Sequence, residues 1–194
     1  MSYEIVLQAL WLILPAYIAN AGALLSGGGT PIDFGKNWKD GKRLLGDGKT
    51  WRGLATGAVI GMAGGFALSI IAFYAHDSDF AFLGLSNFGR FPLMIFIVGS
   101  LCFGALLGDI VESFFKRRRG KRRGEDWVPF DQLDFIIGAL ICSFLIASLL
   151  QVTGITITNW FLDTFTIWHI LVLLVITPFF HVFANFVHRK TNHR

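Results

Sequence analysis

The sequence has few cysteines and few charged side chains. Only Cys102 and Cys142 are cysteines, and both lie in apolar stretches, which excludes a disulfide framework and a thiolate metal centre and predicts that both thiols pack. Charged residues make up 15% of the chain and hydrophobic residues 54%, a balance that excludes a soluble globular domain of 194 residues. The five histidines show no metal-ligand spacing.

The apolar residues form five stretches, each close to the roughly 20 residues that a membrane-spanning helix needs. These stretches cover residues 4–25, 54–75, 91–111, 135–152 and 167–187. The first is not a cleaved signal peptide, because no Lys or Arg precedes it and Pro15 and Asn20 lie inside it. We therefore expect an all-α, polytopic integral membrane protein with five transmembrane helices, in which residues 1–194 form a single domain.

Positive charge is unevenly divided among the segments that join these stretches. Of the 17 Lys and Arg residues, 16 lie in residues 26–53, residues 112–133 or the C-terminal tail, and only Arg90 lies elsewhere. Cytoplasmic segments are the ones enriched in Lys and Arg, so we expect the N-terminus outside and the C-terminus in the cytoplasm. This topology explains the net charge of +4 without a nucleic-acid partner. The expected location is the cell membrane, with two cytoplasmic loops forming the site.

The first basic loop, residues 26–53, combines glycines with Lys and Asp residues. Small residues let backbone N–H groups approach phosphate oxygens, and Lys adds a point charge. A solvated loop made basic by topology would explain the cations but not the glycines or Asp33, Asp40 and Asp47. The composition therefore favours phosphate binding. Asn20, just before this loop, is either a helix–helix hydrogen-bonding amide or a ligand contact.

Acidic residues gather where the third and fourth stretches meet the second basic loop. Asp109 and Glu112 are three residues apart, so they lie on one face of a helix, and Asp131 and Asp134 have the same spacing. If Asp109, Asp131 and Asp134 meet, their charges repel one another unless a cation lies between them, and oxygen ligands favour Mg²⁺. The alternative is that Asp134 caps its helix and Asp109 pairs with an arginine.

The basic block at residues 116–123 is explained in large part by attraction to the anionic headgroups of the bilayer. Ser113 and Lys116 continue the helix face that carries Asp109. Lys116 and Arg117 are the cations nearest the helix, and we expect them to face the site.

Three segments together resemble the CTP-dependent cytidylyltransferases that make CDP-activated membrane lipids. GDIVESFFKR at residues 108–117 resembles the family's GDLxESxxKR, DQLD at residues 131–134 resembles DRxD, and GKTWRG at residues 48–53 resembles PGKTWEG. Asp33 with the following FGK resembles the Asp and FGK that precede that motif. Gln132 replaces the usual Arg, Asp47 replaces Pro, the HGG run is missing and the chain is short. These departures are similar to the compact archaeal branch, the CDP-archaeol synthases.

The resemblance implies transfer of CMP from CTP to 2,3-bis-O-geranylgeranylglycerol 1-phosphate, with Mg²⁺ as cofactor and pyrophosphate as the second product. Combined with the residue patterns, it gives four groups of site residues. The metal ligands are Asp109, Asp131 and Asp134, and the catalytic residues are Lys116, Asp131 and Asp134. The nucleotide-binding residues are Asn20, Asp33, Lys36, Gly48, Lys49, Thr50 and Arg52. Ser113 and Arg117 are assigned to the lipid phosphate.

Other functions remain open at this point. Within the enzyme class, the alternative substrate is a diacyl or another lipid phosphate. Outside it, the alternatives are a small membrane transporter, although few polar residues beyond Asn20 lie deep in the spans, and a scaffold that binds anionic lipid. The oligomeric state is open between a monomer and a homodimer.

Overall fold

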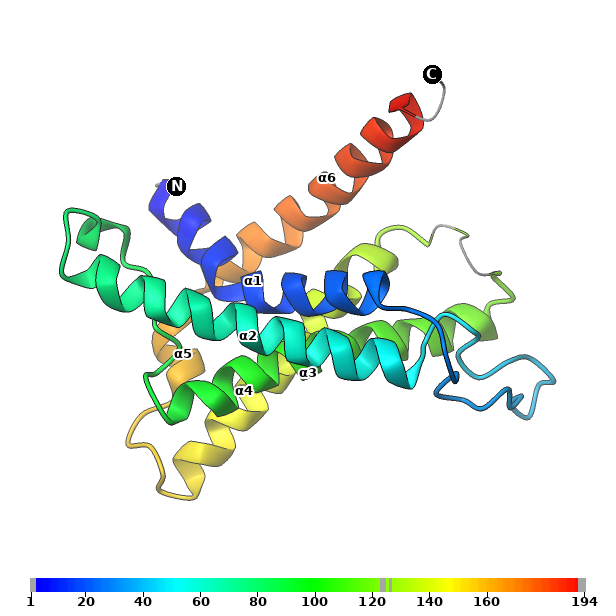
Figure 1. Ribbon diagram of the computed structural model, residues 1–194, viewed down its shortest axis with the longest axis horizontal. Coiled ribbons are helices and arrows are strands. Elements are labelled where there is room, and N and C mark those ends of the chain that lie inside the picture. Colours follow the sequence, from blue (N-terminus) through cyan, green and yellow to red (C-terminus); the bar gives the residue numbers. More distant parts are fainter. Residues whose placement is uncertain (1–2, 123–124, 126, 192–194) are drawn as a thin grey trace.

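The computed structural model describes residues 3–122, 125 and 127–191, with side chains described as far as residue 179. The described chain is helical between its loops, which confirms the all-α prediction (Figure 1). Arg123 of the basic block and Arg194 of the tail lie outside the described residues. The elements are α1 (Tyr3–Leu25), α2 (Trp51–His76), the short 3-10 helix η1 (Ala81–Leu83), α3 (Leu93–Arg118), α4 (Phe130–Val152), α5 (Trp160–Thr164) and α6 (Ile167–Thr191).

Four helices, α1 to α4, are long and apolar enough to cross a membrane. Each coincides with one of the first four apolar stretches, and together they fit an integral membrane protein. The fifth stretch forms α6, whose described apolar part, Ile167–Phe179, is shorter than a full span.

The helices extend beyond the apolar stretches and carry the polar residues with them. Thr50 caps α2, so this helix begins at Trp51. The last turn of α3 contains Lys116 and two arginines, which interact favourably with the C-terminal end of the helix dipole. Asp109, Glu112, Lys116, Asp131 and Asp134 therefore lie on helices, whereas Lys49 lies in the first basic loop.

Small residues bring the helix backbones into contact. A Cβ atom on Gly57 of α2 would lie 2.7 Å from the carbonyl oxygen of Ala19 on α1, and one on Gly104 of α3 would lie 2.5 Å from the carbonyl oxygen of Gly138 on α4. A Cβ on Gly108 would collide with the carbonyl oxygen of Asp134. Close approach through small residues is typical of helix packing in lipid, and here it places the acidic residues of α3 beside those of α4.

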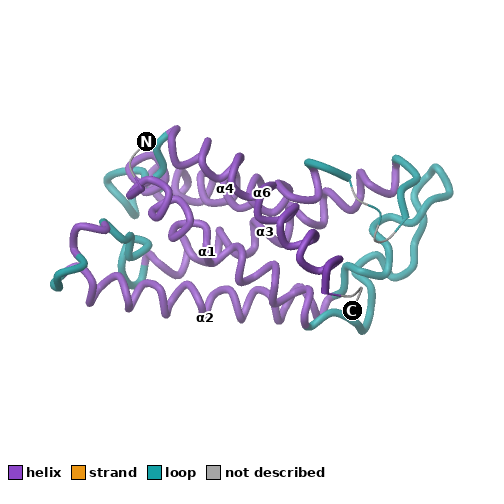
Figure 2. Tube along the Cα trace, turned by 90° about the horizontal axis from the view of Figure 1, so that it is seen from above, coloured by secondary structure: helices purple, strands orange, loops and turns teal. Residues whose placement is uncertain are grey.

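The loops gather at the two ends of the helix bundle (Figure 2). Residues 26–50 and the connection between α3 and α4 lie at one end, whereas the α2–α3 and α4–α5 connections lie at the other. The end of α6 diverges from the bundle (Figure 1). The two basic loops are therefore neighbours, and the helix ends that they join form the candidate site.

Candidate functional site

A polar cavity of about 210 Å³ lies at this end of the bundle. Helices α1 to α4 and the first basic loop all contribute to its walls. Its lining residues are Asn20, Ala23, Leu24, Ile32, Gly48, Lys49, Thr50, Gly53, Leu54, Leu106, Asp109, Ile110 and Asp131. Four of the predicted nucleotide-binding residues, Asn20, Gly48, Lys49 and Thr50, thus share one cavity with two of the predicted metal ligands.

The N-terminus of α2 opens into this cavity. Thr50 has an extended backbone, and its hydroxyl oxygen accepts a hydrogen bond from the Gly53 N–H at 3.1 Å. Thr50 is buried, so its hydroxyl serves as the cap of the helix. The remaining N–H groups of the first turn and the positive end of the helix dipole make such a terminus a good phosphate site.

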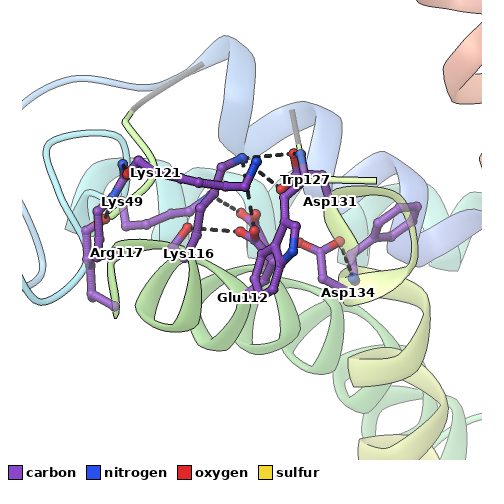
Figure 3. Close-up of polar contacts among 12 residues, drawn as sticks. Lys49, Glu112, Lys116, Arg117, Lys121, Trp127, Asp131 and Asp134 are labelled. Atoms are coloured by element: carbon purple, nitrogen blue, oxygen red, sulfur yellow. Dashed lines mark hydrogen bonds and ion pairs between the residues drawn. The ribbon is translucent and has the colours of Figure 1, made fainter. Parts of the chain in front are cut away.

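Two lysine–carboxylate pairs lie at the cavity. The Nζ atom of Lys49 is 2.5 Å from Oδ2 of Asp109, which is therefore paired with a lysine and not with an arginine. The Nζ atom of Lys116 contacts both oxygens of Asp131 at 2.7 and 2.8 Å, and the Trp127 N–H donates to Asp131 at 2.7 Å. Figure 3 shows Lys116 reaching from α3 toward Asp131 beside Glu112. Two cations are thus available where an anion would enter.

A cluster of three carboxylates, Asp109, Glu112 and Asp134, lies next to these pairs. One oxygen of each falls within 4.8 Å of the others. Glu112 is only 8% exposed, and its Oε1 atom has no hydrogen-bond partner among the described residues. Glu112 is buried and the other two are partly exposed; carboxylates this close are relieved either by a bound cation or by protonation, and an all-oxygen donor set fits Mg²⁺. We call these three residues the acid cluster.

The membership of the acid cluster differs from the predicted metal set. The structure brings Asp109 and Asp134 together, but it adds Glu112 and places Asp131 in the ion pair with Lys116. Asp134 lies inside α4, whose N-cap is Pro129, so the alternative that it caps the helix is wrong. The sequence contained a signal for Glu112, because it follows Asp109 by three residues on the same helix face.

Asp33 organises the first basic loop from within. Its side chain is 1% exposed, pairs with Arg43 at 2.9 Å, and accepts hydrogen bonds from the N–H groups of Gly35, Leu45 and Gly46, each at 3.0 Å. Burial alone would raise the pKa of this carboxyl, but Arg43 and the three N–H groups outweigh it and hold the pKa well below its usual value. Asp33 therefore shapes the loop and does not line the cavity.

The arginines that end α3 hold the same loop from outside. Arg117 donates to the carbonyl oxygen of Leu45 at 3.2 Å, and Arg118 donates to Asp40 at 3.0 Å and to the carbonyl oxygen of Arg43. Lys42 donates in return to the carbonyl oxygen of Arg118 at 3.0 Å. These contacts fasten residues 26–50 to the end of α3.

The remaining predicted site residues lie around the cavity. Ser113 is buried and donates a long hydrogen bond, 3.5 Å, to Oε2 of Glu112. Lys36 and Arg52 are exposed and do not belong to the cavity lining.

A family model, curated relatives and a solved structure each match nearly the whole chain. The CarS-like family model, described as CDP-archaeol synthase, matches residues 2–194. The CDP-archaeol synthase of Halorubrum lacusprofundi is 44% identical over 182 residues, covering 94% of this chain and 91% of its own. The CDP-archaeol synthase of Methanospirillum hungatei is 43% identical over 178 residues, which cover 92% of this chain and 95% of that protein. A solved structure of an intramembrane enzyme for archaeal membrane lipids biosynthesis has a TM-score of 0.70 and 34% identity, covering 93% and 94% of the two chains.

Proposed function

The chain belongs to the CDP-archaeol synthase family, and from this membership we propose how its residues perform the family's reaction. The protein transfers CMP from CTP to 2,3-bis-O-geranylgeranylglycerol 1-phosphate, giving CDP-archaeol and pyrophosphate in membrane phospholipid synthesis. We propose that residues 1–194 form one domain with α6 as a fifth transmembrane helix. In this topology the N-terminus is outside and the site is cytoplasmic. The distribution of Lys and Arg supports this orientation.

The polar cavity is the proposed CTP site. The N-terminus of α2, with Gly48 and Thr50, would receive phosphate oxygens, and Lys49 would exchange its contact with Asp109 for a contact with the triphosphate. Asn20 on α1 also lines the cavity. Asp33 contributes by fixing the shape of the loop, and the exposed cations Lys36 and Arg52 add positive charge at the entrance.

The acid cluster is the proposed Mg²⁺ site, with Asp131 beside it. The donor set fits the ion, because it consists of oxygens and includes a buried Glu112 oxygen with no partner among the described residues. When bound, Mg²⁺ neutralises and orients the reacting phosphates. The acid cluster would hold the ion beside the polar cavity, near the N-terminal end of α4.

The reaction itself needs no protein base. The second pKa of a phosphate monoester is about 6, so the lipid phosphate is largely ionised at neutral pH. One of its oxygens attacks the α-phosphorus of CTP in line, the bond from that phosphorus to the bridging oxygen breaks, and pyrophosphate leaves with the electron pair. Lys116 would neutralise charge on the reacting groups, and Ser113 and Arg117 are assigned to the lipid phosphate. Catalysis is then positioning plus charge stabilisation.

The observation that carries this proposal is the meeting of Lys49, at the start of α2, with Asp109 on α3 across one cavity. The test is an assay of purified protein in detergent with α-labelled CTP, Mg²⁺ and either the geranylgeranyl ether-lipid phosphate or diacyl phosphatidic acid. We expect labelled CDP-lipid from the ether substrate. Asp109→Asn should lose this product, whereas Asp79→Asn, an exposed acid at the opposite end of the bundle, should retain it. Equal product from both lipids would contradict the ether-lipid selectivity, and no product would contradict the reaction.

A further inference from the structure

Arg90 is the one Lys or Arg residue outside the two basic loops and the C-terminal tail, and it lines a cavity of its own. This cavity, of about 450 Å³, lies between the C-terminal part of α2 and the start of α3. That end of the bundle carries the α2–α3 connection and is remote from residues 26–50 (Figure 1). We call it the far-end cavity. It shares no lining residue with the polar cavity or the acid cluster, so the proposed reaction gives it no role.

The turn that presents Arg90 has an unfavourable backbone. Phe88, Gly89 and Arg90 have φ values of 56°, 87° and 61°, in the left-handed region that L side chains rarely adopt. Hydrogen bonds hold the turn, because the Asn87 side chain accepts from the Gly89 N–H at 3.2 Å and the Asn87 carbonyl oxygen accepts from the Ser69 hydroxyl at 2.7 Å. Phe88 is fully buried in the core, whereas Arg90 is exposed. The fold therefore explains the conformation of Phe88 but gives no use for the side chain of Arg90.

The far-end cavity has hydrogen-bond donors without acceptors. The guanidinium of Arg90 makes no hydrogen bond or ion pair with any described residue. Neither acid of the α2–α3 connection pairs with it, and one of them, Asp77, contacts His76 at 3.0 Å. The hydroxyl of Tyr74 and the NH₂ group of Asn87 line the same cavity and also lack a partner in the described part of the chain. The described lining includes no carboxylate, so its net charge is positive.

The remaining walls of the far-end cavity are apolar. Ile70 and Phe73 on α2 line it and are 57% and 56% exposed, and Met94 lines it on α3. Both helices are candidate membrane spans, so these exposed side chains face hydrocarbon. Ile70 lies about one helical turn deeper in α2 than Tyr74, and tyrosine is typical of the boundary between headgroups and hydrocarbon. The cavity thus extends from the headgroup region into the apolar part of the bilayer.

We infer that the far-end cavity binds an anionic membrane phospholipid of the leaflet opposite the candidate site, with the phosphate at Arg90 and a hydrocarbon chain along Ile70 and Phe73. The planar guanidinium suits phosphate oxygens, and a basic residue at the membrane surface attracts anionic headgroups. A soluble anion would use the donors but not the apolar wall. A phospholipid uses both, and its binding does not depend on the proposed reaction.

The first test locates the lipid. An anionic phospholipid with a diazirine near its headgroup is irradiated with the full-length protein in detergent, and the adducts are mapped by mass spectrometry. We expect adducts in residues 69–74 and 87–94, and a separate set in the basic loops that serves as an internal reference. Arg90→Gln should reduce the far-end adducts by about tenfold, because hydrogen bonds to a charged group are lost, and should leave the reference adducts unchanged.

The matched control is Lys39→Gln, which removes an exposed cation from the first basic loop and should leave the far-end adducts unchanged. Unlabelled anionic phospholipid should suppress the far-end adducts at about one tenth of the concentration needed with phosphatidylcholine, whose cation offsets its phosphate. Equal suppression by the two lipids would identify a place for bulk lipid, and suppression by inorganic phosphate would identify a soluble anion. Either result, or wild-type adducts in Arg90→Gln, would overturn the inference.

The second test asks whether Arg90 serves the fold instead. Glycine adopts a left-handed backbone without a Cβ clash, so Arg90→Gly should not lower the melting temperature in a lipid-free zwitterionic detergent. The same variant should lose the far-end adducts, and Arg90→Lys, which keeps the charge, should retain part of them. A fall in melting temperature as large as that of Phe88→Ala, which removes a buried ring, would show that Arg90 supports the fold and would overturn the inference.

Discussion

The surroundings of Glu112 are unfavourable for a charged carboxylate without a ligand. Glu112 is 8% exposed beside Asp109, Asp134 and Asp131, its Oε1 atom has no hydrogen-bond partner among the described residues, and the Nζ atom of Lys116 lies 4.0 Å away. Leaving a buried polar group unsatisfied costs about 1–3 kcal/mol, and more when the group is charged. A bound cation would remove that cost, which supports counting Glu112 among the proposed metal ligands.

A comparison of three variants tests this assignment. Glu112→Gln and Asp134→Asn should each raise the Mg²⁺ concentration needed for half-maximal stabilisation by CTP by at least about tenfold, because each removes a charged oxygen ligand. Asp131→Asn should raise it less, since Asp131 is held by Lys116. The measurement is the melting temperature with CTP across a Mg²⁺ titration. A larger effect of Asp131→Asn than of Glu112→Gln would return Asp131 to the ligand set expected from the sequence.

For individual residues, the sequence predicted which side chains lie at the site better than it predicted which of them pair with one another. The spacing of Asp109, Asp131 and Asp134 identified an acidic centre, and the structure places all three at one end of the bundle. The sequence could not show that Asp131, and not Glu112, pairs closely with Lys116. That choice depends on where the Nζ atom of Lys116 lies after α3 and α4 have packed. Nor could the sequence place Asp33, whose partners are set by the folding of a loop without helical or strand periodicity.

The close packing of α3 against α4 positions the acid cluster. Gly108→Ala introduces a Cβ that collides with the carbonyl oxygen of Asp134, so the helices must move apart. We expect the free energy of unfolding to fall by about 1–3 kcal/mol, as for other overpacked contacts, and kcat/KM to fall with it. Thermal unfolding and CDP-lipid formation would be measured on the same preparation.

The control for this prediction lies on the same helix. A Cβ on Gly99 of α3 has no atom within 4 Å, so Gly99→Ala should be neutral or stabilising by up to about 1 kcal/mol. If both variants behaved alike, the close approach of α3 and α4 would not be what positions the acid cluster.

The apolar stretches predicted where the helices lie, but they did not predict where the helices end. The apolar stretch at residues 91–111 predicts the core of α3, but the helix continues to Arg118 because its last turn is basic and is held by the first loop. The residue spacing, unlike the hydropathy, predicted that Ser113 and Lys116 continue the helix face of Asp109, and the structure places both on α3 with Arg117 in its last turn. Hydropathy cannot detect an extension made of charged residues.

For the molecule as a whole, orientation in the membrane is the prediction with the clearest test. Ser78→Cys lies in the α2–α3 connection and Lys39→Cys in the first basic loop, at opposite ends of the bundle. With the basic loops in the cytoplasm, a membrane-impermeant maleimide should label Ser78→Cys in intact cells and Lys39→Cys only after the cells are opened. The protein without either substitution supplies the background, since Cys102 is buried and Cys142 lies within a span. The reverse labelling pattern would invert the proposed topology.

The contacts between the first loop and the end of α3 also determine the order in which the protein can assemble during synthesis. Arg117 and Arg118 bind Leu45 and Asp40, which precede them by 72 and 78 residues. At about 5–20 residues per second, a ribosome needs roughly 4–16 s to cover that separation. During this interval the loop lies at the membrane surface without these partners. Asp109 is synthesised after α2, and Asp131 is synthesised after α3. The nucleotide cavity is therefore completed only after α4 is inserted, and nascent chains that end before α4 should not retain CTP.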